Sequence, residues 1–139
     1  MSSVLARFRG TTDCQCLTDA RKIRADLLEW SFKEENIPKK YRNSFIPAIK
    51  TELNDIVNHT RAAQYSFPTD NEKLKARKEH IKLAEDAVVN LWQELQCLDD
   101  ARRNSGGINL TKLEPVLTEI YNLQLALRTW RKNSKIQKA

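Results

Sequence analysis

The hydrophobic positions of this chain recur at alternating spacings of three and four residues, which is the pattern of an amphipathic α-helix. Two stripes, spanning residues 81–98 and 113–130, step by 3, 4, 3, 4 and 3, the spacing of helices that pack along one seam. Leu74 extends the first stripe toward the N-terminus, and Leu117 and Tyr121 widen the second. The stripe positions are Ile81, Ala84, Val88, Leu91, Leu95 and Leu98, then Leu113, Val116, Ile120, Leu123, Leu127 and Trp130.

Two further helices are predicted before these. The first is expected to begin near Thr18, an N-cap residue, and to end before Pro38. The second is expected to begin at Ser44 with Pro47 in its first turn, where the missing N–H costs little. The segment 36–43, "NIPKKYRN", is then a loop. The apolar faces are Ile23, Leu27 and Trp30, then Phe45, Ile49, Leu53, Ile56, Thr60 and Ala63.

Capping and turn residues mark the ends of the third helix and the start of the fourth. Thr69 with Glu72, and Thr111 with Glu114, each match the S/T-x-x-E capping box. The third helix is expected over residues 70–103. The glycines that follow in "NSGGIN" suit the left-handed end of a helix and the turn beyond it.

Four amphipathic helices joined by short loops predict an all-α, up-down-up-down antiparallel four-helix bundle. Only three glycines and four prolines in 139 residues agree with a helical chain. The expected organisation is a flexible arm over 1–16, the bundle over 17–133 and a basic tail over 134–139. No apolar run approaches the roughly 20 residues of a membrane span, so no membrane partner and a cytoplasmic location are expected.

The net charge of +6 is unevenly distributed: residues 111–139 carry six bases and only two acids. An uneven basic balance is a footprint of polyanion binding. A run between Lys73 and Lys82 alternates with acids and is interpreted as a solvated helix with i,i+4 pairs. The tail has no acid between residues 120 and 139. Contact with nucleic acid and a solvated, cation-rich helix end both remain open for it. The candidate nucleic-acid-binding residues are Lys39, Lys40, Arg42, Arg128, Arg131, Lys132 and Lys135.

Catalytic and metal chemistry find no support in the residue patterns. Cys14, Cys16 and Cys97 are interpreted as ordinary thiols, because structural zinc needs four ordered ligands. His59 and His80 lie on separate segments, and neither completes the Glu-x-x-His motif of di-metal bundles. His80 is expected to be exposed. The chain is therefore not expected to be an enzyme or to need a cofactor, and a nuclease would require clustered carboxylates for metal.

Three stretches resemble a family of bacterial four-helix-bundle proteins: "IPKKYRNSF", "AEDAVVNLWQEL" and "LTKLEPVLTEIYNLQLALRTWRKN". That family includes proteins encoded in intervening sequences of 23S ribosomal RNA genes and the accessory variability determinant of diversity-generating retroelements. The resemblance covers about residues 18–133. Its most specific parts are the I-P-K-K segment and the last helix, which ends in Trp130 followed by basic residues.

The resemblance implies a homopentameric barrel that binds RNA or DNA and serves a reverse transcriptase as a non-catalytic accessory subunit. Basic family members carry arginines around the third-helix tryptophan, whereas Trp92 here has Asn90 and Gln93 beside it. The contact surface is thereby expected at the Pro38 segment and the tail. The wide hydrophobic stripe of the fourth helix, residues 113–130, predicts core or subunit contacts for Leu117, Tyr121 and Trp130. The alternative function is an oligomeric protein-interaction scaffold without a direct nucleic-acid role.

Overall fold

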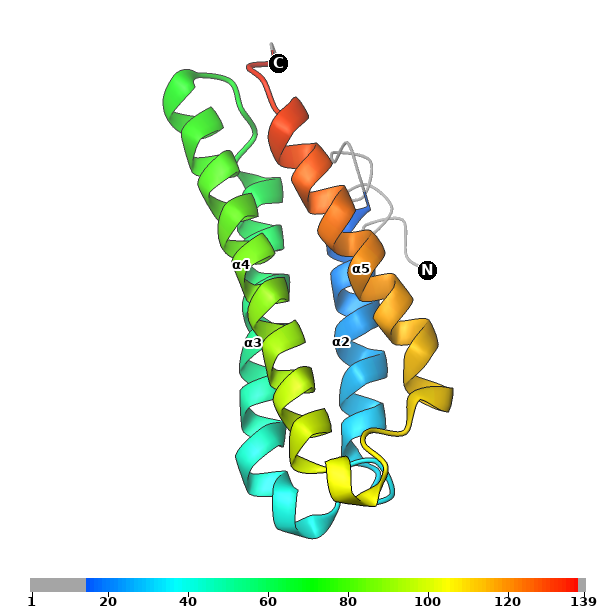
Figure 1. Ribbon diagram of the computed structural model, residues 1–139. Coiled ribbons are helices and arrows are strands. Elements are labelled where there is room, and N and C mark those ends of the chain that lie inside the picture. The colour runs from blue at the N-terminus through cyan, green and yellow to red at the C-terminus, as the bar shows by residue number, and fades with distance from the viewer. Residues whose placement is uncertain (1–14, 138–139) are drawn as a thin grey trace, which may run out of the picture.

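The computed structural model describes residues 15–137, which fold as a bundle of α-helices without a β-strand (Figure 1). The all-α prediction is therefore confirmed for this part of the chain. The predicted arm over 1–16, apart from Gln15 and Cys16, lies outside the described residues, as do the last two residues of the predicted tail. The elements are α2 (Cys16–Phe32), α3 (Lys39–Tyr65), α4 (Asn71–Ala101), the short 3-10 helix η1 (Arg103–Ser105) and α5 (Leu110–Asn133).

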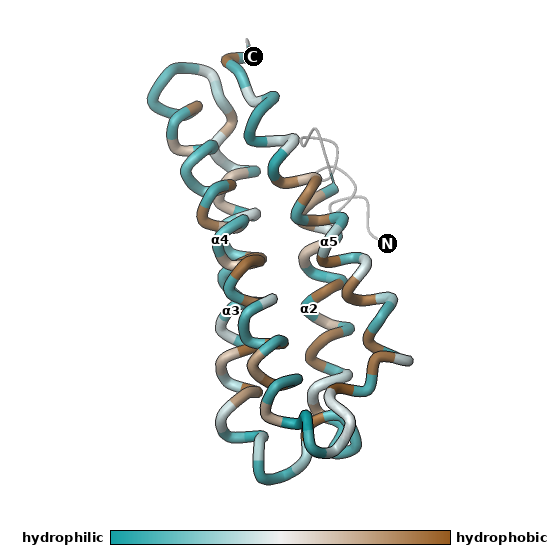
Figure 2. The backbone as a smooth tube through the Cα atoms, in the orientation of Figure 1, coloured by the Kyte–Doolittle hydropathy of each residue, from teal (hydrophilic) through white to brown (hydrophobic). Residues whose placement is uncertain are grey.

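The four α-helices alternate in direction, and each packs against its two neighbours around a closed ring. Short connections permit only this up-and-down order, because each helix must return beside the one before it. Hydrophobic and hydrophilic residues alternate along each helix (Figure 2). All six predicted stripe positions of α5 and all six of α4 are buried. The predicted core is thus confirmed, together with Ile23, Leu27 and Trp30 of α2.

The predicted starts of the first two helices are wrong. α2 begins at Cys16 after Gln15, and Thr18 lies inside its first turn without acting as a cap. α3 begins at Lys39, directly after Pro38, so the expected loop over 36–43 is mostly helix. Proline is well suited to precede a helix, because its own φ is fixed and its missing N–H is not needed there. Pro47 therefore lies in the interior of α3 rather than in its first turn.

The predicted N-cap residues of α4 and α5 are each displaced, by one residue in α4 and by two in α5. Asp70, not Thr69, caps α4, since its side chain accepts a hydrogen bond from the Lys73 N–H at 2.8 Å. Asn109, not Thr111, caps α5 by accepting from the Thr111 N–H at 3.1 Å. Asp and Asn are at least as favourable as Thr at the N-cap position. Asp70 and Asn109 therefore occupy it in preference to the nearby threonines.

The turn after α4 contains both predicted left-handed glycines, although the helix ends at Ala101 rather than at Arg103. Gly106 and Gly107 have φ values of 92° and 79°. A Cβ on Gly107 would lie 2.5 Å from Asp99 Oδ1. That same oxygen accepts from the Ile108 N–H at 2.9 Å, so the close approach closes the turn.

A buried arginine joins three helices where α3 ends and α4 begins. Arg77 is 1% exposed, and its guanidinium donates from Nε to the Ala63 carbonyl at 3.0 Å and from Nη2 to the Gln64 carbonyl at 3.3 Å. The charge lies 5.3 Å from the Trp130 ring and 5.7 Å from the Phe67 ring. It therefore satisfies carbonyls at the negative end of α3 while aromatic faces shield it. The prediction that Arg77 belongs to a solvated run is wrong.

Among residues 15–137, none of the helices combines the length and the apolar character that crossing a membrane requires.

Candidate nucleic-acid interface

The last turns of α5 carry exposed cations without acidic partners. Arg128, Lys132 and Lys135 are exposed, and none of them forms a salt bridge with any residue in the range 15–137. Arg128 and Lys132 are four residues apart, one helical turn, so they project from the same side of α5. Lys135 follows the helix on a segment that the Gln137 N–H ties to the Pro68 carbonyl at 2.9 Å. These cations are therefore presented by backbone that is held in place.

Arg131 is not a free cation, contrary to the expectation of a tail without a compensating acid. Its Nε donates to Glu85 Oε2 at 2.5 Å and its second nitrogen donates to Glu85 Oε1 at 3.2 Å. This bidentate hydrogen bond raises the pKa of the Arg131 guanidinium above its ordinary value. Glu85 belongs to α4, so the acid that neutralises Arg131 is 46 residues away in the sequence.

The ion pair also fixes which residues of α4 lie beside the tail. Together with the hydrogen bond from Trp92 Nε1 to Gln124 Oε1 at 3.0 Å, it marks the seam between α4 and α5. Toward the start of α4 from Glu85, Lys78 and Lys75 follow on this side of the helix. They form no salt bridge with a described residue. We call the resulting set of unpaired cations the basic strip; its members are Arg128, Lys132, Lys135, Lys75 and Lys78.

The solvated-helix interpretation of the run on α4 is confirmed for Lys73, Lys75 and Lys82, which are exposed. Lys82 pairs with Asp86 at 3.3 Å in the expected i,i+4 arrangement. Lys75 and Lys78 have no salt-bridge partner among residues 15–137, and this part of the strip was missed as a candidate. The signal that could have found it is the shared side of the helix: Lys75, Lys78 and Lys82 are three and four residues apart.

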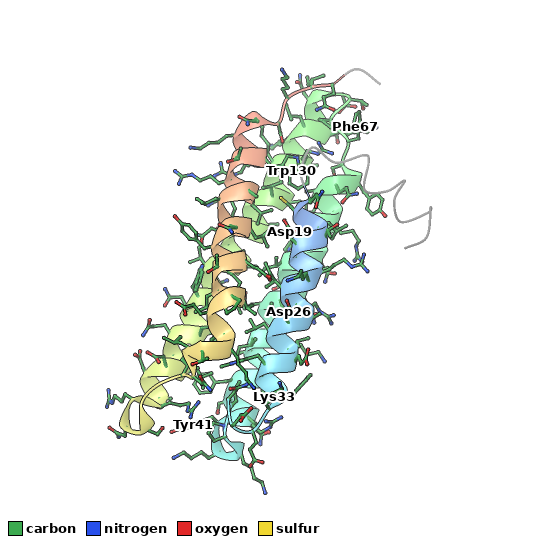
Figure 3. All side chains as sticks on the ribbon, turned by 90° about the vertical axis from the view of Figure 1, so that its right-hand side faces the viewer. Asp19, Asp26, Lys33, Tyr41, Phe67 and Trp130 are labelled. Carbon is green, nitrogen blue, oxygen red and sulfur yellow. The ribbon has the colours of Figure 1, made fainter. Side chains whose placement is uncertain are left out.

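The second predicted cluster lies at the opposite end of the bundle. Figure 3 places Phe67 and Trp130 near one end and Lys33 and Tyr41 near the other. The 31 residues of α4 separate the two ends by about 46 Å. Lys39 and Lys40 are exposed there, in the first turn of α3. The structure therefore does not bring the two predicted clusters into one surface.

Arg42, at the same end of the bundle as Lys39 and Lys40, is engaged in hydrogen bonds to the backbone. It donates to the Phe32 carbonyl at 3.0 Å and to the Ile37 carbonyl at 3.3 Å, and so satisfies the backbone between α2 and α3. Lys40 lies 5.0 Å from the Tyr41 ring centroid. Of the three predicted cations in this cluster, only Lys39 has no described contact of its own.

The three residues predicted for core or subunit contacts differ in how deeply they are buried. Trp130 is 5% exposed and packs on Arg77, so it belongs to the core. Leu117 is partly buried against the core. Tyr121 is 55% exposed. It lies on the α4 side of α5, seven residues before Arg128 along the same side of the helix.

Two histidines that the sequence places on separate helices lie together in the fold. The rings of His59 on α3 and His80 on α4 stack with centroids 5.9 Å apart. Both side chains are partly buried, so the expectation of an exposed His80 is wrong. In the range 15–137, no three His, Cys, Asp or Glu residues are grouped so that they could hold a metal ion. Cys16 is buried and Cys97 is exposed.

A shallow pocket of about 200 Å³ lies between α2 and α5, lined by Asp19, Lys22, Glu119 and Asn122. Burial raises the pKa of the Asp19 carboxyl, and the charge of Glu119 raises it further. The Lys22 ammonium forms an ion pair with the Glu119 carboxylate and another, at 3.1 Å, with the Asp26 carboxylate. The charged groups here compensate one another, and the pocket is on the other side of α5 from the basic strip.

Glu52 gives the fold a pH dependence that can be measured. Burial raises the pKa of its carboxyl, and the charge of Asp55 adds to the increase. Because the folded pKa is raised, the ionised form destabilises the native state, and stability is lost as pH rises through that pKa. Glu52→Gln is therefore expected to raise Tm at pH 7, and this gain should disappear below about pH 4, where glutamate is protonated in both states.

Thermal unfolding followed by circular dichroism across this pH range would measure the effect. Glu29→Gln, at an exposed position of α2, is the control and should leave Tm nearly unchanged. A gain for Glu52→Gln that is the same at acidic and neutral pH would contradict the assignment.

No protein-family model matches the chain, and neither curated proteins nor solved structures provide a match to it, so the geometry of the described residues carries the functional argument.

Proposed function

We propose that this protein is a non-catalytic nucleic-acid-binding protein that acts as an accessory subunit of a reverse transcriptase and binds template RNA or cDNA. The observation that carries the binding role is the basic strip. Its cations come from α4, from α5 and from the segment that follows α5. Four of the five are exposed, Lys78 is partly exposed, and none has a salt-bridge partner within the described residues. Phosphate oxygens are the anions that such a row recognises without regard to sequence.

The energetics favour a polyanion over a single acidic side chain. Exposed lysines and arginines lose little hydration in forming phosphate contacts, and each contact releases condensed counterions from the nucleic acid. One isolated surface ion pair contributes only about 0–1 kcal/mol, so a single carboxylate would be held weakly. A row of phosphates engages several members of the strip at once.

The reverse transcriptase and the homopentamer enter the proposal through the resemblance of the I-P-K-K segment and the last helix. The polymerase partner and the pentamer are both proposed from the family resemblance, and the geometry of a single chain does not bear on either. Mass measurement in solution tests the pentamer, and co-purification with the reverse transcriptase of the same genome tests the partner. A monomer would remove the pentamer from the proposal and leave nucleic-acid binding to be tested by itself.

Salt dependence is the direct test of the binding role. The affinity for labelled RNA or DNA, measured by fluorescence anisotropy between about 50 and 200 mM salt, should fall steeply. Three to five phosphate contacts predict a slope of log K against log salt of about −2 to −4. Undetectable binding at the lowest salt would contradict the proposal and favour the protein-interaction scaffold, in which the same cations meet an acidic protein.

A further inference from the structure

The basic strip continues into exposed hydrophobic residues on the same side of α5. Counting back from Lys132, the residues at steps of 4, 3 and 4 are Arg128, Leu125 and Tyr121, so they lie along one line on the helix surface. Tyr121 is 55% exposed and Leu125 is 44% exposed. A phenol ring that remains this open on a folded helix is a flat surface without a described partner ring.

The neighbouring surface of α4 includes an exposed apolar side chain among polar ones. Val89 is 44% exposed. Trp92 is partly buried, and its indole N–H is engaged by Gln124, so its hydrogen-bonding capacity is already used inside the seam. Tyr121 is thus an exposed aromatic ring two helical turns before Arg128 on the same side of α5.

The shape of the face argues against reading a duplex through its grooves. α4 and α5 pack side by side, and two helices 8–10 Å apart, each about 10–12 Å thick, present a face about 20 Å wide. The major groove of B-DNA is about 12 Å wide and admits one helix. The deep major groove of an RNA duplex is narrower still. The face can reach base surfaces only where bases are unpaired.

We propose that the ligand of this face is a single-stranded nucleic acid, with its phosphates along the basic strip and one base stacked on the Tyr121 ring. The inference rests on the proposed nucleic-acid binding and specifies its ligand. Stacking on an aromatic side chain is tolerant of sequence, because every base has a π-face. The strip supplies the charge and the tyrosine supplies the discrimination between single and double strands.

A second copy of this chain could cover Tyr121 instead, as the wide stripe of α5 suggested. The charge of the face decides against it. Two copies that met through this face about a two-fold axis would bring basic strips together, and like charges in contact destabilise an interface. A strand of phosphates has the opposite sign and complements the same surface.

The test compares an unstructured strand of about 16 nucleotides, the upper range of single-strand site sizes, with the duplex that it forms with its complement. DNA and RNA versions are both measured by anisotropy at low salt. The wild-type protein should bind the single strand more tightly, although the duplex has the higher charge density. Tyr121→Ala should weaken single-strand binding by about 5- to 100-fold with an unchanged salt slope, while Tyr121→Phe should retain it.

Phe32→Ala is the matched control. Phe32 is also 55% exposed, but it ends α2 near the opposite end of the bundle, so its loss should leave binding unchanged. Equal or tighter binding of the duplex, or full affinity in Tyr121→Ala, would overturn the single-strand inference and leave the proposed function standing. A change of solution mass in Tyr121→Ala would assign the ring to contacts between copies and also overturn the inference. Failure of both nucleic acids to bind would instead contradict the proposed function itself.

Discussion

Replacing Arg77 with alanine should lower the free energy of unfolding by about 3 kcal/mol, a large part of the 5–15 kcal/mol typical of a folded domain. The substitution removes the donors that satisfy the Ala63 and Gln64 carbonyls at the end of α3. It also leaves a void beneath the Trp130 ring, in a fully buried position. Unsatisfied buried carbonyls and a cavity both destabilise the native state.

Urea unfolding followed by circular dichroism measures this loss, with the midpoint expected to fall at a nearly constant m-value. Arg77→Lys should give a smaller loss, because it keeps the charge and the stem but not the planar fork that reaches two carbonyls. Lys75→Ala, two residues away and exposed, is the control and should stay within about 0.5 kcal/mol of the wild type. An Arg77→Ala protein as stable as this control would mean that the buried contacts contribute nothing.

Reversing the charges of Arg128 and Lys132 together should weaken nucleic-acid binding by about 100-fold or more at low salt. Each reversal removes an attraction of about 1 kcal/mol in water and replaces it with a repulsion of similar size. The salt slope should become shallower by about 2, one for each phosphate contact that is lost. The loss should be about equal for all sequences, because phosphates carry no sequence information.

The double variant Lys50→Glu and Lys112→Glu is the matched control for this experiment. Both lysines are exposed and lie outside the basic strip, on α3 and at the start of α5. The change in net charge is the same in the two double variants. Equal weakening in both would show that total charge, and not the location of the strip, determines binding.

The core of this fold could be predicted from the sequence because burial follows the helical period. The steps of three and four residues through α4 and α5 identify buried positions without any knowledge of the neighbouring helices. Helix starts were less predictable. Thr18 and Thr69 are acceptable caps, and the choice between them and adjacent residues depends on backbone geometry that several side chains can satisfy.

Arg77 could have been recognised as an internal residue from its position. It lies three residues after Leu74 and four before Ile81, and it therefore occupies a position of the hydrophobic stripe. The charge of the side chain led to the opposite interpretation, since arginine is almost never fully buried unless it is paired. Its partners are backbone carbonyls of another helix, which residue types do not reveal.

The pairing of Arg131 with Glu85 could not have been predicted. It depends on the axial register between α4 and α5, which is set by how their side chains interdigitate over many turns. A shift of one turn would place a different residue beside Arg131. The same register places Lys75 and Lys78 of α4 on the side of that helix that faces the end of α5.

The hydrogen bond between the Gln137 N–H and the Pro68 carbonyl ties the backbone beyond α5 to the loop that precedes α4. Chain ends beyond a last helix usually sample many conformations, and their charges are spread over a wide volume. Here the segment between Trp130 and Gln137 is fixed at both ends, at the first by the ring on Arg77 and at the second by the backbone bond. Lys132 and Lys135 are thereby preorganised, and a ligand that meets them loses less conformational entropy than one that must order a loose tail.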